Sequence, residues 1–128
     1  MDVITEKRAE MIFISLTGRI DNQSAETLEE NLSKIIAEGA RQLIIDCSQI
    51  EHINNAGLRV LLNLAKQVLD FDGRIALHSP SQSARAIFDR TGFSLVSRIY
   101  ETREEAIAGV AGSGVLSASR NDRRFVTK

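Results

Sequence analysis

The chain has 128 residues, of which 43% are hydrophobic and 26% are charged, and its formal net charge is −1. These values are typical of one soluble globular domain and give no support for direct nucleic-acid binding. The single cysteine excludes an internal disulfide and fits a reducing compartment. The start lacks a signal-peptide pattern, and no apolar run approaches the roughly 20 residues needed to cross a bilayer. We therefore expect a cytoplasmic protein without membrane insertion.

The first part of the chain alternates like a strand pair and then becomes helical. Residues 2–6 and 11–17 are predicted strands around a turn at 7–10, because apolar and polar residues alternate in the second segment. Residues 19–22 are expected to form a loop. Ser24 is expected to cap a helix over residues 25–38, which Gly39 ends.

The centre of the chain holds an apolar strand, a polar turn and a periodic helix. Residues 43–47 lack polar alternation, which favours a central strand covered on both faces. The following turn opens a helix that runs to about Phe71. Its apolar positions fit the helical period, and they are Leu58, Leu61, Leu62, Ala65, Val68 and Leu69.

The last part of the chain repeats the alternation of strands and helices. Residues 74–78 and 95–100 are predicted strands, and a helix between them starts after Ser79-Pro80-Ser81 and ends at Gly92. A capping box over residues 102–105 opens a last helix that runs to about Val110. The element order ββαβαβαβα predicts one α/β domain, residues 1–110, with a mixed β-sheet and packed helices.

Residues 111–128 differ in composition from the rest and are predicted to form a flexible basic tail. They are rich in glycine and serine and carry four basic residues against one acidic residue. A basic tail could bind an anionic partner. Four cations are a weak signal, and we favour an inert, solvated tail.

Three motifs resemble those of one known family. They are Leu16-Thr17-Gly18-Arg19-Ile20-Asp21, the strand Leu43-Ile44-Ile45-Asp46-Cys47-Ser48, and the helix start Asn54-Asn55-Ala56-Gly57-Leu58. Together with the element order, they are similar to the STAS family, and in particular to bacterial anti-sigma factor antagonists. The resemblance covers roughly residues 3 to 110.

The resemblance implies a regulatory mechanism without catalysis or a cofactor. Members of this group dock on an anti-sigma factor that has a kinase-like, ATP-binding fold, and docking frees a sigma factor. The partner phosphorylates a serine or threonine at the helix start, and the complex separates. The phosphate would add about −1.5 to −2 charges to the docking face.

The sequence departs from the family pattern at the phosphoacceptor position. Alignment on Gly57 and Leu58 places Ala56 there, and no hydroxyl residue lies between Ile50 and Gly57. Ala56 could be natural, could be an engineered trap for the active form, or could mark a domain that has left sigma regulation. We favour a natural alanine, because Asn54 and Asn55 also lack hydroxyls.

The resemblance implies a partner-binding site at two loops and the helix start. Several residues also have a simpler interpretation: Asn54 and Asn55 as helix caps, Arg59 as a solvated side chain, and Ser48 as a partner of backbone groups in a turn. The predicted partner-binding residues are Asp21, Asn22, Ser48, Asn54, Asn55, Ala56, Gly57, Leu58 and Arg59.

Other chemistry has little support in the sequence. His52 and His78 lie too far apart in the sequence for a zinc motif, and Cys47 at a strand end is expected to be a buried apolar residue. No catalytic constellation is evident at the helix start, so we expect no enzyme, no cofactor and no metal. A STAS scaffold or ligand-binding module of a transporter complex remains the alternative, and a homodimer stays open.

Overall fold

The structure, a computed structural model, describes residues 1–113, and the predicted order of elements is confirmed. The predicted tail lies outside the described residues from residue 114 onward. The elements are β1 (Asp2–Arg8), β2 (Met11–Ile20), α1 (Asn22–Ala37), β3 (Gln42–Ile53), α2 (Asn55–Asp70), β4 (Arg74–His78), α3 (Gln82–Thr91), the 3₁₀ helix η1 (Phe93–Leu95), β5 (Arg98–Tyr100) and α4 (Arg103–Ser113).

The five strands form one mixed sheet in the order β1-β2-β3-β4-β5. The hairpin β1–β2 is antiparallel, and the pairs β2–β3, β3–β4 and β4–β5 are parallel. The predicted central strand is confirmed, because β3 lies between β2 and β4 and its residues Leu43, Ile44 and Ile45 are at most 1% exposed. Helix-covered parallel strands are normally buried on both faces in this way.

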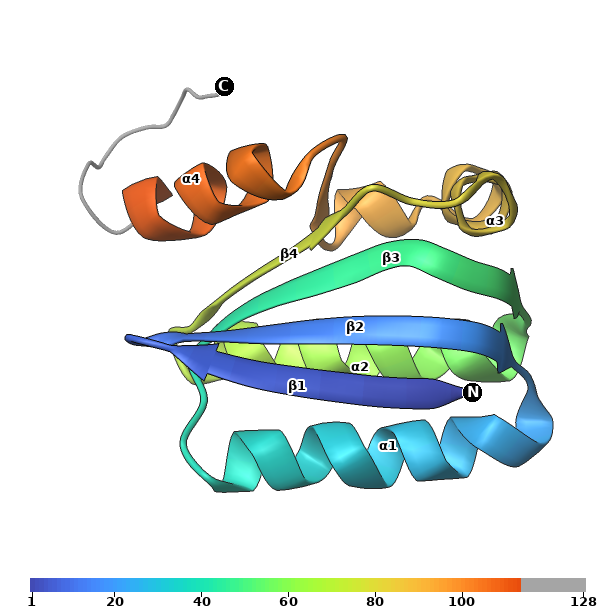
Figure 1. Cartoon of the computed structure of the whole chain (residues 1–128), viewed down its shortest axis with the longest axis horizontal. Coiled ribbons are helices and arrows are strands. Elements are labelled where there is room, and N and C mark those ends of the chain that lie inside the picture. The colour runs from blue at the N-terminus through green and yellow to red at the C-terminus, as the bar shows by residue number, and fades with distance from the viewer. Residues whose placement is uncertain (114–128) are drawn as a thin grey trace.

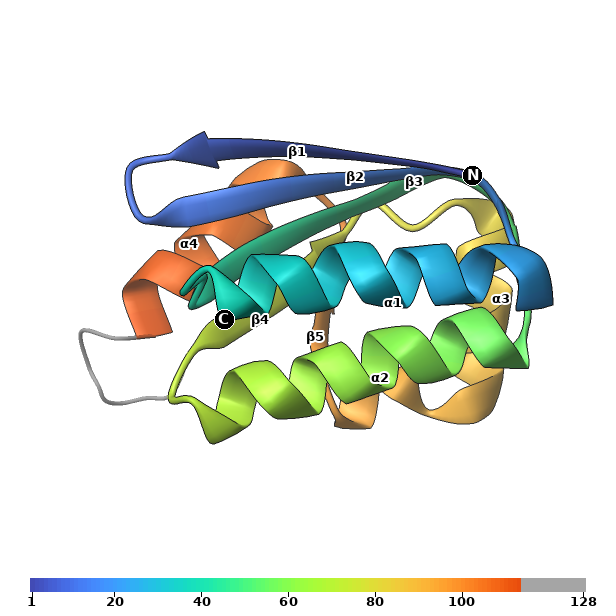
Figure 2. The ribbon, with the colours of Figure 1, turned by 90° about the horizontal axis from the view of Figure 1, so that it is seen from below.

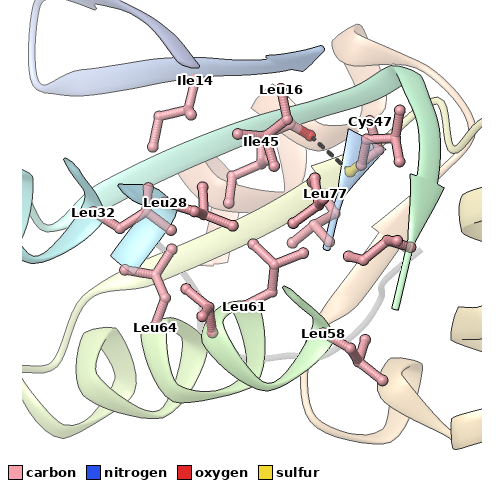
Figure 3. Packing of buried hydrophobic residues seen from close by; sticks show 14 of the residues in the cluster. Ile14, Leu16, Leu28, Leu32, Ile45, Cys47, Leu58, Leu61, Leu64 and Leu77 are labelled. Carbon is pink, nitrogen blue, oxygen red and sulfur yellow. Dashed lines mark hydrogen bonds between the residues drawn. The ribbon is translucent and has the colours of Figure 1, made fainter. Parts of the chain in front are cut away.

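Helices cover both faces of the sheet. Helices α1 and α2 lie side by side against one face (Figure 2), and α4 lies on the other side, over β3 and β4 (Figure 1). The larger core fills the space under α1 and α2, where leucine side chains of both helices meet those of the strands (Figure 3). A smaller apolar cluster lies under α4 and includes Ile44, Ala76, Ala106 and Val110.

Strand β3 is longer than predicted, and it contains two irregularities. It continues from Gln42 to Ile53, past the predicted end at Cys47. Its pairing with β2 shifts between Ser15 and Thr17 and again between Gly18 and Arg19, and at each place β3 carries one extra residue. Each bulge interrupts the alternation of faces. The buried residues are therefore three apart, at Cys47, Ile50 and Ile53. Because this spacing lacks the alternation typical of a strand, the second half of β3 was not predicted from the sequence.

The start of α1 differs from the prediction. Ile20 belongs to β2, and the helix begins at Asn22 with Asp21 as its N-cap, so neither the predicted loop nor the Ser24 cap is correct. Ser24 has a reciprocal role: its hydroxyl accepts a hydrogen bond from the Asp21 backbone N–H at 2.8 Å, while the Asp21 carboxylate accepts from the Ser24 N–H. This capping box satisfies two backbone donors at once. The Ser24 N–H lowers the pKa of the Asp21 carboxyl.

Three further predictions need correction. The predicted strand over residues 95–100 is the 3₁₀ helix η1 followed by the short strand β5. Leu69, predicted to lie on the apolar stripe of its helix, is 49% exposed near the end of α2. The capping box of the last helix is present, since the Glu105 N–H donates to the Thr102 hydroxyl, but α4 continues to Ser113.

Gly57 allows the first turn of α2 to lie directly against the ends of β2 and β3. A Cβ atom at this position would overlap the Ile20 Cγ2 atom and lie 3.1 Å from the Ile53 Cγ1 atom. Both isoleucines are buried and packed in the larger core. The contact therefore fixes the distance between the start of α2 and the sheet.

We expect Gly57→Ala to lower the free energy of unfolding by about 1–3 kcal/mol, because the added methyl overpacks the core. Helix propensity alone predicts the opposite sign, a gain of up to about 1 kcal/mol. Urea denaturation of the two proteins distinguishes these outcomes. In a double-mutant cycle, Ile20→Ala should reduce the penalty of Gly57→Ala, and additive effects would contradict the contact.

His78 is a buried titratable group at the end of β4. Its side chain is 4% exposed, and its Nδ1 atom lies 2.8 Å from the Ser79 hydroxyl, which donates to the Glu101 carbonyl. Burial lowers the pKa of His78 below its ordinary value of 6.5. The nearby Asp46 and Glu104 oppose this shift, whereas Arg103 adds to it.

The depressed pKa predicts that acid destabilises the fold through His78. Below about pH 6.5 the unfolded chain protonates this imidazole while the folded chain does so only at lower pH, so the unfolded state binds more protons. The free energy of unfolding should fall as the pH drops below about 7, toward the lower pKa of the folded state. His78→Asn should flatten that slope, whatever its effect at neutral pH. An equal slope in both proteins would exclude His78 as the cause.

Candidate functional site

The start of α2 and the start of α1 lie at the same end of the molecule (Figures 1 and 2). Two hydrogen bonds join them. The Asn54 backbone N–H donates to the Ile20 carbonyl at 3.0 Å, and the Asn54 side-chain amide donates to the Asn22 Oδ1 atom at 3.0 Å. Asp21 and Asn22, at the start of α1, therefore lie beside the turn that contains Asn54.

Asn54 is the N-cap of α2. Its Oδ1 atom accepts a hydrogen bond from the Gly57 N–H at 3.1 Å, while its amide nitrogen binds Asn22. Both ends of this side chain are thus held, and the capping role proposed for Asn54 is confirmed. Asn55 is not a cap, because it is the first residue of the helix, and its side chain is exposed.

The predicted site residues at the helix start differ in accessibility. Asn22, Asn55 and Arg59 are exposed, and Ala56 is partly exposed and packs one side against the core. Gly57 and Leu58 are buried, and Leu58 is 5% exposed. A partner can therefore reach the first three side chains and Ala56, whereas Gly57 and Leu58 position the helix.

The electrostatics of this end favour an acidic partner surface. The first turn of α2 contains no acidic residue, and Arg59 adds a positive charge one turn further along. The aligned peptide dipoles place a partial positive charge at a helix N-terminus. The neighbouring carboxylate of Asp21 is engaged in capping α1, as its bonds to the Gln23 and Ser24 N–H groups show.

Ser48 lies apart from the other predicted site residues. It is exposed and belongs to the bulged part of β3, not to a turn. Its backbone N–H donates to the Asp46 carboxylate at 2.9 Å. It lies six positions before Asn54 along an extended strand, a separation on the order of 15–20 Å. The structure therefore does not bring Ser48 together with the start of α2.

One residue that shapes this end of the sheet was not predicted from the sequence. Ser81 caps α3, and its hydroxyl donates to the Ile50 carbonyl at 2.6 Å while its N–H donates to the Cys47 carbonyl at 3.1 Å. These bonds tie the start of α3 to the bulged part of β3. The Ser-Pro-Ser segment signalled a helix start, but nothing in the sequence indicated the strand that it would bind.

In residues 1–113, no group of three or more histidine, cysteine or acidic side chains could hold a metal ion. Cys47 is buried, as expected, and its burial raises the pKa of its thiol. None of the helices in this part of the chain is long and apolar enough to span a membrane.

Comparison with known proteins agrees with the motifs. The family model described as STAS domain matches residues 2–106. A putative anti-sigma factor antagonist, BtrV of Bordetella bronchiseptica, is 31% identical over 108 residues, which are 84% of this chain and 93% of that protein. The anti-sigma-F factor antagonist RsfB of Mycobacterium tuberculosis is 24% identical, over 80% of this chain and 83% of its own length.

Solved structures show the same fold. The unphosphorylated form of the anti-sigma factor antagonist SpoIIAA superposes with a TM-score of 0.74 at 25% identity, covering 87% of this chain and 97% of that one. A putative anti-sigma factor antagonist from Thermotoga maritima gives a TM-score of 0.79 at 19% identity, covering 85% and 94%. The chain belongs to the STAS-domain family and, by homology, to its anti-sigma factor antagonists.

Proposed function

We propose that this protein is a non-catalytic regulator that binds an anti-sigma factor with a kinase-like, ATP-binding fold. Its docking surface would consist of Asn22, Asn54, Asn55, Ala56 and Arg59. The observation that carries the proposal is the hydrogen bond between the side chains of Asn54 and Asn22, which joins the starts of two helices into one surface. The similarity to anti-sigma factor antagonists supports the class of partner.

The proposed surface is built for recognition rather than for chemistry. Its side chains are amides, a methyl group and a guanidinium, and none of these is an evident general base or nucleophile. Asn22 and Asn54 are held by each other, so little side-chain entropy remains to be lost at that point on binding. Arg59 is exposed and can pair with a partner carboxylate.

We further propose that the docking surface is not switched by phosphorylation at the usual position. Ala56, the second residue of α2, carries no hydroxyl, and neither do the flanking residues Asn55 and Gly57. Binding would then be controlled by the amounts of the two proteins. The alternative, a STAS scaffold or ligand-binding module of a transporter complex, is also consistent with Ala56, because such a module needs no phosphoacceptor.

A negative charge at Ala56 should abolish binding if this surface docks on the partner. We expect bait carrying Ala56→Asp to lose an anti-sigma factor that the unchanged protein captures from lysate of the native cell. An acidic residue in the first turn of α2 suits the helix dipole, so the fold should persist. The matched control is Ala108→Asp at an exposed position of α4. Equal capture by all three baits, or capture of transporter subunits, would contradict the proposal.

Restoring a hydroxyl should restore the switch. We expect the captured kinase-fold partner, supplied with ATP and Mg²⁺, to phosphorylate the Ala56→Ser variant and not the unchanged protein. Intact-mass spectrometry measures the added phosphate. Phosphate on the unchanged chain would show that another residue, such as the exposed Ser48, is the acceptor. A partner that phosphorylates neither protein would contradict a phosphoacceptor position at Ala56.

A further inference from the structure

A small cavity lies at the β5 edge of the sheet, away from the docking surface. Its volume is about 180 Å³. Helix α2 contributes Leu69, close to its C-terminal end, whereas the docking surface lies at its N-terminal end. The lining residues are Leu69, Arg74, Ile75, Ala76, Val96, Ser97, Arg98, Tyr100, Gly109 and Val110.

The cavity exists because β5 is shorter than β4. The three residues of β5 pair with Ala76, Leu77 and His78, so Arg74 and Ile75 have no neighbouring strand on that side. The cavity lies beside this unpaired part of β4. Tyr100 packs closely against Gly109 of α4, where a Cβ atom would overlap the phenol, and this contact closes one wall.

Two arginines line the cavity without an acidic partner. In residues 1–113, the ion pairs are Glu6 with Arg8 and Arg85 with Glu101, so Arg74 and Arg98 belong to neither. The Arg74 guanidinium donates to the carbonyl of its neighbour Gly73, at 3.3 Å. Guanidinium groups in such a setting favour a planar anion, which they can bind through two parallel hydrogen bonds.

A buried hydroxyl is also left without a partner in the cavity wall. Ser97 is 5% exposed, and its Oγ atom makes no hydrogen bond with any described residue. The accessible area of that Oγ atom is under 1 Å², so the hydroxyl lies behind the cavity wall and a ligand in the cavity does not reach it directly. The rest of the wall is mainly apolar, with Leu69, Val96 and Val110.

We propose that this cavity binds a small carboxylate with a short apolar chain. The carboxylate would bind Arg74 and Arg98, and the chain would contact Leu69 and Val110. The volume lies below the roughly 300–1,000 Å³ of drug-sized sites, which limits the ligand to a small molecule. This site is separate from the docking surface and does not depend on the proposed function.

The test is a ¹⁵N-¹H NMR titration of the full chain with sodium hexanoate at constant ionic strength. We expect saturable shift changes centred on the amides of residues 96–98 and 109–110. Hexanamide has the same chain without the charge and should bind about tenfold more weakly. Inorganic phosphate tests whether the cavity binds any anion, and it should not cause saturable shift changes at these amides.

The arginine variants decide whether the cavity is the site. The double variant Arg74→Gln/Arg98→Gln should weaken hexanoate binding about tenfold or more, whereas Arg19→Gln, an exposed position at the end of β2, should leave it unchanged. Equal affinity for hexanamide, equal affinity in the double variant, or shift changes spread over surface arginines would overturn the proposal. Saturable shift changes of the same amides with phosphate would show a general anion site and would also overturn the proposal.

Discussion

The close contact between Gly57 and Ile20 is the constraint on which the shape of the docking end depends. It brings the first turn of α2 against the last residue of β2, where the Asn54 N–H reaches the Ile20 carbonyl. A longer distance would separate Asn54 from Asn22 and break the bond between their side chains. The glycine of the family motif thus acts through packing, because it sets the position of the start of α2 relative to the start of α1, which is far away in the sequence.

Local patterns in the sequence were sufficient for most of the fold. Periodicity predicted α2, and the apolar run at Leu43–Ile45 predicted a central strand, because each pattern reflects one regular geometry. Where the geometry is irregular, prediction failed. The two bulges of β3 give buried residues three apart, a spacing that fits neither a regular strand nor a complete helix. The bulges follow from pairing with β2, which no local window of sequence contains.

The site could be predicted in part for the same reason. The Asn54 cap is a local interaction and was recognised, whereas the contact of Asn54 with Asn22 spans 32 positions in the sequence and was only implied by the family resemblance. Ser48 was grouped with the site through the family resemblance. The extended backbone between Ser48 and Asn54 carries them apart, because the strand continues where a turn was expected.

Helix α2 links the docking surface and the cavity, yet its packing argues that the two act independently. The helix has sixteen residues, about 24 Å in length, with Asn55 at one end and Leu69 close to the other. Signal transfer would require the helix to shift as a unit, since its buried stripe is close-packed on the sheet. The contact of Gly57 with Ile20 opposes such a shift at the docking end. A carboxylate in the cavity would therefore stabilise the fold without altering the docking surface.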